Sequence, residues 1–188
     1  MKHTLKTIVH GPAKSNCYVL SKDGRTLVID AGAPRAMIEG EVDALLLTHG
    51  HFDHTDYAHE FSCDIYMNEA DVDVYAFTKN AFDLSHSPSD NEVIELAGFK
   101  IIAMHVPGHT PGGICYYFPK EKLLFTGDTL FAGTIGRTDF PGGNSSALIK
   151  ELKIIIGTLP NKVEVYPGHG VPTTIGRELE KNRFFKST

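Results

Sequence analysis

Residues 48–55, THGHFDHT, place three histidines and one aspartate within six positions, directly after the apolar run ALLL. His49 and His51 are two positions apart, so at the end of a strand their side chains point the same way. Asp53 and His54 follow where the chain is expected to turn into a helix. Imidazole and carboxylate are ligands of catalytic zinc, iron and manganese. The segment therefore predicts metal binding at the end of a buried strand, in two adjacent clusters.

Four residues cannot complete two metal sites, so further ligands are expected at other strand ends. Three candidates each follow an apolar strand and lie beside glycine, where the backbone can turn sharply. They are His109 in VPGHTPGG, Asp128 in FTGDTLF and His169 in YPGHG. Each alone would be an ordinary strand-end residue, but together with HxHxDH they predict metal ligation. The other histidines are predicted to be surface or core residues: His3, His10, His59, His86 and His105.

Short runs rich in Val, Ile, Leu and Tyr recur along the chain and end at Gly, Pro or Asp, which predicts strands. The predicted strands are 5–9, 16–20, 26–29, 44–47, 64–67, 100–104, 113–118, 122–125 and 163–166. An apolar stripe at helical spacing predicts a helix over 145–159, and weaker patterns predict helices over 56–61 and 69–77. Residues 81–91 have no period and are expected to form a surface loop, which is a candidate to lie over a site with His86 in it. Strands mixed with helices predict sheets shielded by helices.

Length, composition and charge restrict the class of protein. The 188 residues, 41% hydrophobic and 22% charged, predict one folded domain. A net charge of −5 argues against a nucleic-acid partner. No apolar run reaches the ~18–20 residues of a membrane span, and the N-terminus lacks the apolar centre of a signal peptide. Cys17, Cys63 and Cys115 are odd in number and far apart, which suits reduced thiols and predicts a cytoplasmic location.

Four motifs together carry a family resemblance: THGHFDH at 48–54, GHT at 108–110, GDT at 127–129 and GHG at 168–170. Their order and spacing resemble the metallo-β-lactamase superfamily over almost the whole chain. Segments 107–113 and 125–131 are most similar to the glyoxalase II (hydroxyacylglutathione hydrolase) branch, and 135–141 is similar to its short relatives. The resemblance implies an α/β (α+β) fold, a four-layer αββα sandwich of two mixed β-sheets flanked by helices.

The resemblance also implies a role for each candidate ligand. The first metal would be held by His49, His51 and His109, the second by Asp53, His54 and His169, and Asp128 would bridge them. The cofactors would be two divalent ions, with zinc favoured over iron or manganese. An aspartate at position 128 argues against the β-lactamases that carry a cysteine there.

The expected reaction is hydrolysis of a thioester such as S-lactoylglutathione. A metal lowers the pKa of bound water from 15.7 to roughly 7, so a metal-bound hydroxide is the expected nucleophile on the carbonyl. Asp53 and Asp128 are the predicted catalytic residues, because they would fix that hydroxide. Arg137 is the predicted substrate-binding residue, since its planar guanidinium suits an anionic group. The alternative for Arg137 is an ion pair with Asp139.

The chain ends soon after His169, without the C-terminal helical domain of full-length glyoxalase II, so residues 1–188 are predicted to be a single metallo-β-lactamase-like domain. The predicted partner is a small-molecule thioester, glutathione-linked or not, with no nucleic acid and no membrane. Three other functions stay open. They are a persulfide dioxygenase with one iron held by two histidines and an aspartate, a phosphodiester hydrolase, and a non-catalytic metal-binding module.

Overall fold

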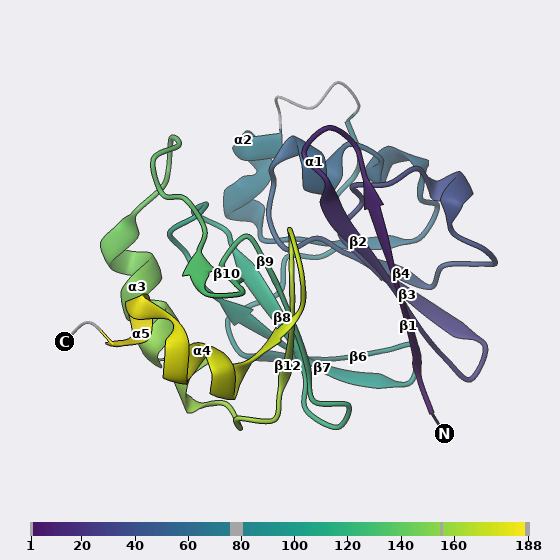
Figure 1. Ribbon diagram of the computed structural model, residues 1–188. Helices are drawn as coiled ribbons and strands as arrows, with labels where there is room; N and C mark the ends of the chain where they lie inside the picture. The colour runs from purple at the N-terminus through teal and green to yellow at the C-terminus, as the bar shows by residue number, and fades with distance from the viewer. Residues whose placement is uncertain (1, 76–80, 155, 187–188) are drawn as a thin grey trace.

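Two mixed β-sheets lie face to face at the centre of the molecule (Figure 1). The computed structural model describes residues 2–75, 81–154 and 156–186. The first sheet has the strand order β1-β2-β3-β4-β5, with the bounds β1 Thr4–His10, β2 Ser15–Lys22, β3 Arg25–Ile29, β4 Ala44–Leu46 and β5 Asp64–Tyr66. Its first three strands are antiparallel, whereas β3, β4 and β5 run parallel to one another.

The second sheet has the order β13-β12-β9-β8-β7-β6. The bounds are β6 Glu92–Leu96, β7 Phe99–His105, β8 Ile114–Phe118, β9 Leu123–Gly127, β12 Glu164–Pro167 and β13 Thr173–Thr174. Only the β9–β12 pair is parallel. A small hairpin follows β9 and consists of β10 Leu130–Phe131 and β11 Thr134–Ile135.

Helices lie outside each sheet (Figure 1). The first sheet is accompanied by α1 Phe52–Thr55 and α2 Val72–Tyr75, and the second by α3 Ser145–Ile154, α4 Ile175–Lys181 and α5 Arg183–Lys186. Four 3₁₀ turns complete the elements: η1 Arg35–Met37, η2 Ala58–Glu60, η3 Glu69–Asp71 and η4 Ile156–Thr158. Among the described residues, no helix has both the length and the apolar character that crossing a bilayer requires.

Three apolar clusters hold these layers together. The central cluster packs Leu27 of the first sheet and Phe125 of the second into one core. Another packs Phe61 against the outer face of the first sheet, and the third packs Leu148 of α3 and Ile175 of α4 against the second sheet. The predicted α+β sandwich of two mixed sheets between helices is therefore confirmed.

The predicted strands are present to within a few residues, but the two-residue strands β10, β11 and β13 and the longer strand β6 were not predicted. This strand lies at the edge of the second sheet, where charged side chains are common because only one face is covered. Of its five residues only Ile94 is buried, while Glu92 and Glu95 are exposed. The apolar signal that predicts a central strand is therefore weak here.

The helix predictions need three corrections. The helix predicted over 145–159 ends with α3, and η4 follows, because Gly157 and Pro160 disfavour a continuing helix. The helix predicted over 56–61 is only the 3₁₀ turn η2, whereas the regular turn α1 begins earlier. The helix predicted over 69–77 is η3 followed by α2, and its last two positions lie outside the described residues.

Residues 81–91 form an irregular segment, as predicted, but the segment lies along β5 rather than over the candidate site. His86 pairs with Tyr66 in an isolated bridge and stacks on its ring, with 4.5 Å between the ring centroids. The side chain of Asp64 lies 3.6 Å from His86 Nε2. These contacts hold His86 against β5, away from the predicted ligands.

Strand ends from both sheets meet at one edge of the sandwich. The parallel pair β9–β12 brings the segments after both strands together, and Gly168 N donates to Gly127 O over 2.7 Å. Asn16 of the first sheet donates its backbone N–H to Gly168 O over 2.7 Å. The segment after β4, which begins at Thr48, reaches the same edge, since Ile114 N donates to Thr48 O over 2.8 Å. This edge carries the candidate site.

Candidate metal centre and pocket

The structure brings all seven predicted ligands into one cluster, although they come from four separate segments. Their side-chain nitrogen and oxygen atoms form three overlapping groups, each within 4.8 Å. The groups are His49, His51 and His109; His49, His54 and Asp128; and Asp53, His54 and His169. The first and third groups have the composition predicted for the two metals, and the second joins them.

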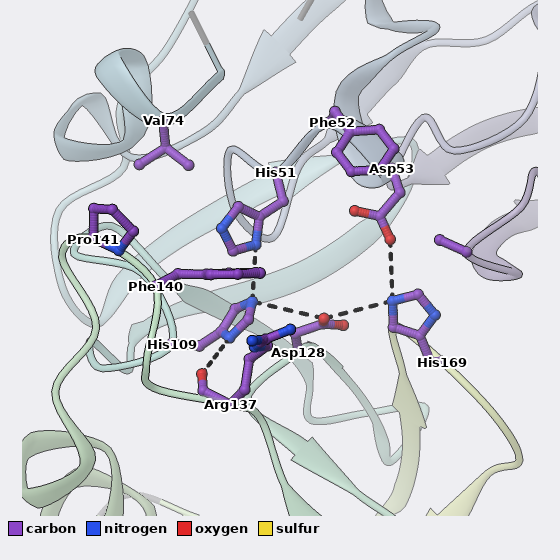
Figure 2. A pocket seen from close by; sticks show the side chains of 11 residues that line it. His51, Phe52, Asp53, Val74, His109, Asp128, Arg137, Phe140, Pro141 and His169 are labelled. Atoms are coloured by element: carbon purple, nitrogen blue, oxygen red, sulfur yellow. Dashed lines mark hydrogen bonds and ion pairs between the residues drawn. The ribbon is translucent and has the colours of Figure 1, made fainter. Parts of the chain in front are cut away.

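The first group consists of three imidazoles. His51 Nδ1 lies 3.0 Å from His109 Nε2. Figure 2 draws this contact as a dashed line. The ring centroids of His49 lie 4.9 Å from those of both His51 and His109. Three imidazoles that converge in this way form the histidine set of many catalytic zinc sites.

The third group, Asp53, His54 and His169, combines a carboxylate with two imidazoles. His169 Nε2 lies 3.1 Å from Asp53 Oδ2, and His54 Nε2 lies 3.5 Å from the same oxygen. The two Nε2 atoms are 3.4 Å apart. This group can therefore offer one oxygen and two nitrogens to a single ion.

Asp128 lies between the two groups. Its Oδ1 is 3.4 Å from His54 Nε2, and its Oδ2 is 3.5 Å from His169 Nε2 and 3.6 Å from His109 Nε2 (Figure 2). A carboxylate that faces histidines of both groups can contribute one oxygen to each metal, which is the geometry a bridging ligand needs.

Two buried atoms show that the cluster fits a cation. Within the described part of the chain, neither His49 Nε2 nor Asp128 Oδ1 has a hydrogen-bond partner. The other ring nitrogen of His49 lies 3.0 Å from Thr48 Oγ1, which directs Nε2 into the cluster. A buried polar atom without a partner costs about 1–3 kcal/mol, so these two atoms are explained by an ion that binds between them. The donor set of imidazole and carboxylate suits zinc, iron or manganese.

The pKa shifts separate the neutral histidines His49 and His51 from the ionised carboxylates of the cluster. Burial lowers the pKa of His51 to about 4 and the pKa of His49 well below its usual value, so both rings are neutral, as metal ligands must be. Hydrogen bonding to Asp128 and Asp53 raises the pKa of His169 to about 10. Burial alone would raise the pKa of Asp128, but His54 and His169 hold it well below its usual value. The carboxylates are therefore ionised and attract cations.

Asp30, which sequence reasoning missed, supports the cluster from the core. Its Oδ2 lies 2.8 Å from His54 Nδ1, and its Oδ1 accepts from Thr48 N over 2.8 Å. Its backbone φ is +61°, in the left-handed region that aspartate tolerates better than most residues. The segment IDAG after an apolar strand has the same pattern, an acidic residue close to glycine at a strand end, that identified the other candidates.

Arg137 contributes to the site through its backbone as well as its side chain. Its carbonyl oxygen lies 2.7 Å from His109 Nδ1, which directs His109 Nε2 towards the cluster. Its guanidinium donates two hydrogen bonds of 2.7 Å to Asp139, the ion pair considered as the alternative to substrate binding. The same guanidinium lies 3.8 Å from the centre of the Phe140 ring.

A pocket of about 790 Å³ opens onto the cluster (Figure 2). It exposes Asp53, Asp128 and several of the histidines, while apolar side chains form much of its wall. The apolar lining residues are Ala13, Phe52, Val74, Phe140 and Pro141. Phe52 is 58% exposed and Phe140 is 41% exposed, so both rings are available to a bound molecule. The volume is in the range of small-molecule sites.

The curated proteins that are similar to this chain include the following two relatives of similar length. A probable metallo-hydrolase of Streptococcus pyogenes serotype M6 is 36% identical, over 96% of this chain and 89% of that protein. The hydroxyacylglutathione hydrolase GloC of Haemophilus influenzae is 32% identical, over 93% of this chain and 94% of that protein.

Two solved structures have the same fold as this chain. The crystal structure of the B3 metallo-β-lactamase BLEG-1 superposes with a TM-score of 0.87 at 31% identity, covering 98% of this chain and all of that one. TTHA1623 in a di-iron-bound form superposes with a TM-score of 0.81 at 29% identity, covering 95% of this chain and 99% of that one.

The family model of the metallo-β-lactamase superfamily matches residues 10–169. This range includes every residue of the cluster. The fold implies a dinuclear metal site, for which the clustered histidines and aspartates are the candidate ligands. The chain therefore belongs to the metallo-β-lactamase superfamily and is a metal-dependent hydrolase.

Proposed function

We propose that this chain hydrolyses a small-molecule thioester, with S-lactoylglutathione as the model substrate, and uses two divalent metal ions, zinc before iron or manganese. The observation that carries the proposal is the position of Asp128 between two groups of ligands at the floor of an open pocket. The similarity to hydroxyacylglutathione hydrolase GloC supports a thioester as the substrate.

Each group of ligands has a defined part in this reaction. His49, His51 and His109 would hold the first ion, and Asp53, His54 and His169 the second, with Asp128 shared between them. Two bound ions would supply the positive charge that activates a water for attack and polarises the carbonyl oxygen.

The carboxylates and the pocket would position the reactants. Asp53 and Asp128 face the pocket and can orient the attacking water by accepting its hydrogen bonds. A thiolate leaves readily, because a thiol with a pKa near 8.5 needs no strong acid to assist it. The exposed rings of Phe52 and Phe140 would hold the parts of the substrate that do not react.

Arg137 is proposed to hold an anionic group of the substrate, such as a carboxylate of glutathione. It lines the pocket, and its side chain is more than half exposed, so a ligand can reach the guanidinium. Its pair with Asp139 is on the surface and is worth little in water, so exchanging that partner for a substrate carboxylate costs little.

The setting proposed for this reaction is a single domain, residues 1–188, in the cytoplasm. One central core joins both sheets, which supports a single folding unit. All three cysteines are free, and Cys17 and Cys115 are buried, as is common in reducing compartments.

Purified holoprotein assayed with three substrates tests the proposal. We expect steady hydrolysis of S-lactoylglutathione that is lost in an Asp128→Asn variant. A chromogenic cephalosporin is included because of the similarity to BLEG-1, described as a B3 metallo-β-lactamase. Turnover of the cephalosporin alone, or oxygen uptake with glutathione persulfide and no hydrolysis, would overturn the thioesterase proposal.

A further inference from the structure

Asp71, at the end of η3, holds two loops together from inside the protein. Its side chain is completely buried. Its Oδ2 accepts from Gly50 N over 2.9 Å, and its Oδ1 accepts from Gly112 N over 2.6 Å. One carboxylate therefore satisfies two backbone N–H groups from segments that are far apart in the sequence.

Both loops carry proposed ligands of the first metal. Gly50 lies between His49 and His51, so the hydrogen bond to its N–H fixes the peptide that joins these two ligands. Gly112 follows His109 by three residues in the loop between β7 and β8. A residue outside the set of proposed ligands therefore links the two loops that carry all three imidazoles.

The packing around Asp71 leaves little room for movement. A Cβ atom added to Gly112 would lie 2.7 Å from Asp71 Oδ1 and 3.0 Å from the Cβ of Asn68. Asn68 in turn accepts from Asp71 N over 3.0 Å and, through its side chain, from Ala70 N over 2.9 Å, which fixes the start of η3. Gly112 and Asn68 therefore both restrict the position of the Asp71 carboxylate.

Burying a carboxylate is costly unless hydrogen bonds compensate, and here backbone donors of two ligand loops supply them. An apolar side chain of similar size would leave the buried N–H groups of Gly50 and Gly112 without a partner. The contacts of Asp71 therefore converge on the segments that carry the proposed metal ligands.

We propose that Asp71 is a positioning residue for the first metal, which it serves by setting the distance between the His49–His51 loop and the His109 loop. The inference rests on the proposed function, since it uses the ligand assignment made there. It concerns metal affinity and does not give Asp71 a part in the chemistry.

Zn²⁺ titration against a chromophoric chelator tests this inference with Asp71→Asn. Asparagine keeps the size of the side chain but turns one oxygen into a donor that faces an N–H. In a His169→Ala background, which isolates the first site, we expect the dissociation constant for Zn²⁺ to rise about 10–100-fold, as for other residues that orient ligands. In a His51→Ala background, which isolates the second site, Asp71→Asn should change the dissociation constant for Zn²⁺ less than about twofold.

Glu178→Gln is the matched control. Glu178 is also a buried carboxylate that accepts from a backbone N–H, that of Gly133 over 2.8 Å, and from Thr173 Oγ1 over 2.6 Å. Neither partner lies in the loops that carry the proposed ligands of the first metal. Glu178→Gln should leave both Zn²⁺ affinities unchanged even if it lowers thermal stability. Unchanged first-site affinity in Asp71→Asn, or equal losses at both sites, would overturn the inference. Failure of the unmodified protein to bind two Zn²⁺ would instead contradict the proposed function.

Discussion

Asp30 Oδ2 lies 2.8 Å from His54 Nδ1, in the interior of the protein where both side chains are buried. The carboxylate fixes which ring nitrogen of His54 carries the proton and leaves Nε2 to face Asp53, Asp128 and His169. The residue directly after β3 of the first sheet thus orients a histidine proposed to hold the second metal.

Replacing Asp30 with Asn should weaken the second metal site. The amide cannot accept a hydrogen bond from His54 and from Thr48 with the same geometry, so the ring of His54 loses its fixed orientation. We expect Zn²⁺ affinity at the second site to fall about 10–100-fold, with a loss of about 2 kcal/mol in the unfolding free energy of the metal-free protein. Chelator competition and urea unfolding measure the two effects, and unchanged affinity would show that Asp30 has no part in metal binding.

Replacing Gly168 with Ala should block the site by occupying its space. The added Cβ would lie against Asp128 Oδ1 and 2.6 Å from His54 Cε1. We expect metal content to fall to one ion per chain or fewer. Gly157→Ala is the control, because the added Cβ there would find no atom closer than 3.8 Å. Elemental analysis measures the metal content of both variants. Full metal content in Gly168→Ala would contradict the predicted clash of the added Cβ with the cluster.

The ligands were predictable because each one carries a local signal, whereas the residues that support them are less visible. Each predicted ligand outside HxHxDH follows an apolar strand and lies beside glycine. Asp30 has a similar signal and could have been found by it. Asp71 could not, because its partners are backbone N–H groups that only the tertiary structure brings near. The same holds for the carbonyl of Arg137, since any residue at that position has one.

The strands and helices also differ in how far local sequence signals predict them. The central strands of both sheets are apolar on both faces and were predicted from the sequence. The edge strand β6, of which only Ile94 is buried, was missed because its exposed residues hide the strand pattern. The turn η2 lies where the helix over 56–61 was expected, and η3 followed by α2 lies where the helix over 69–77 was expected.

Asp139→Asn should release Arg137 for an anionic substrate. The hydrogen bonds from Arg137 lower the pKa of Asp139 to about 2, so the pair stays ionised at any pH used for assay. Removing the carboxylate should lower KM for S-lactoylglutathione several-fold, whereas Arg137→Ala should raise it, with little change in kcat for either. Glu151→Gln removes the same charge from a surface pair on α3 and serves as the control. Equal KM values in all variants would remove Arg137 from substrate binding.

Stability should fall in alkaline solution because of the buried thiols. Burial raises the pKa of Cys115 from 9.0 to about 12, so its thiol is neutral in the folded protein while the unfolded chain ionises above pH 9. The stabilisation is complete below pH 9 and is lost as the pH rises towards 12, at about 1.4 kcal/mol per pH unit for this thiol. For Cys115→Ala, urea unfolding between pH 8 and 11 measures the unfolding free energy at each pH. Above pH 9 this free energy should fall less steeply with pH than in the unmodified protein, by that amount. An identical slope would contradict the assignment.

Metal content should be measured on protein purified without added metal, and S-lactoylglutathione hydrolysis followed on the same sample. We expect close to two ions per chain with turnover, and the loss of at least one ion together with turnover in Asp128→Asn. One iron per chain, no hydrolysis and oxygen uptake with glutathione persulfide would contradict this expectation.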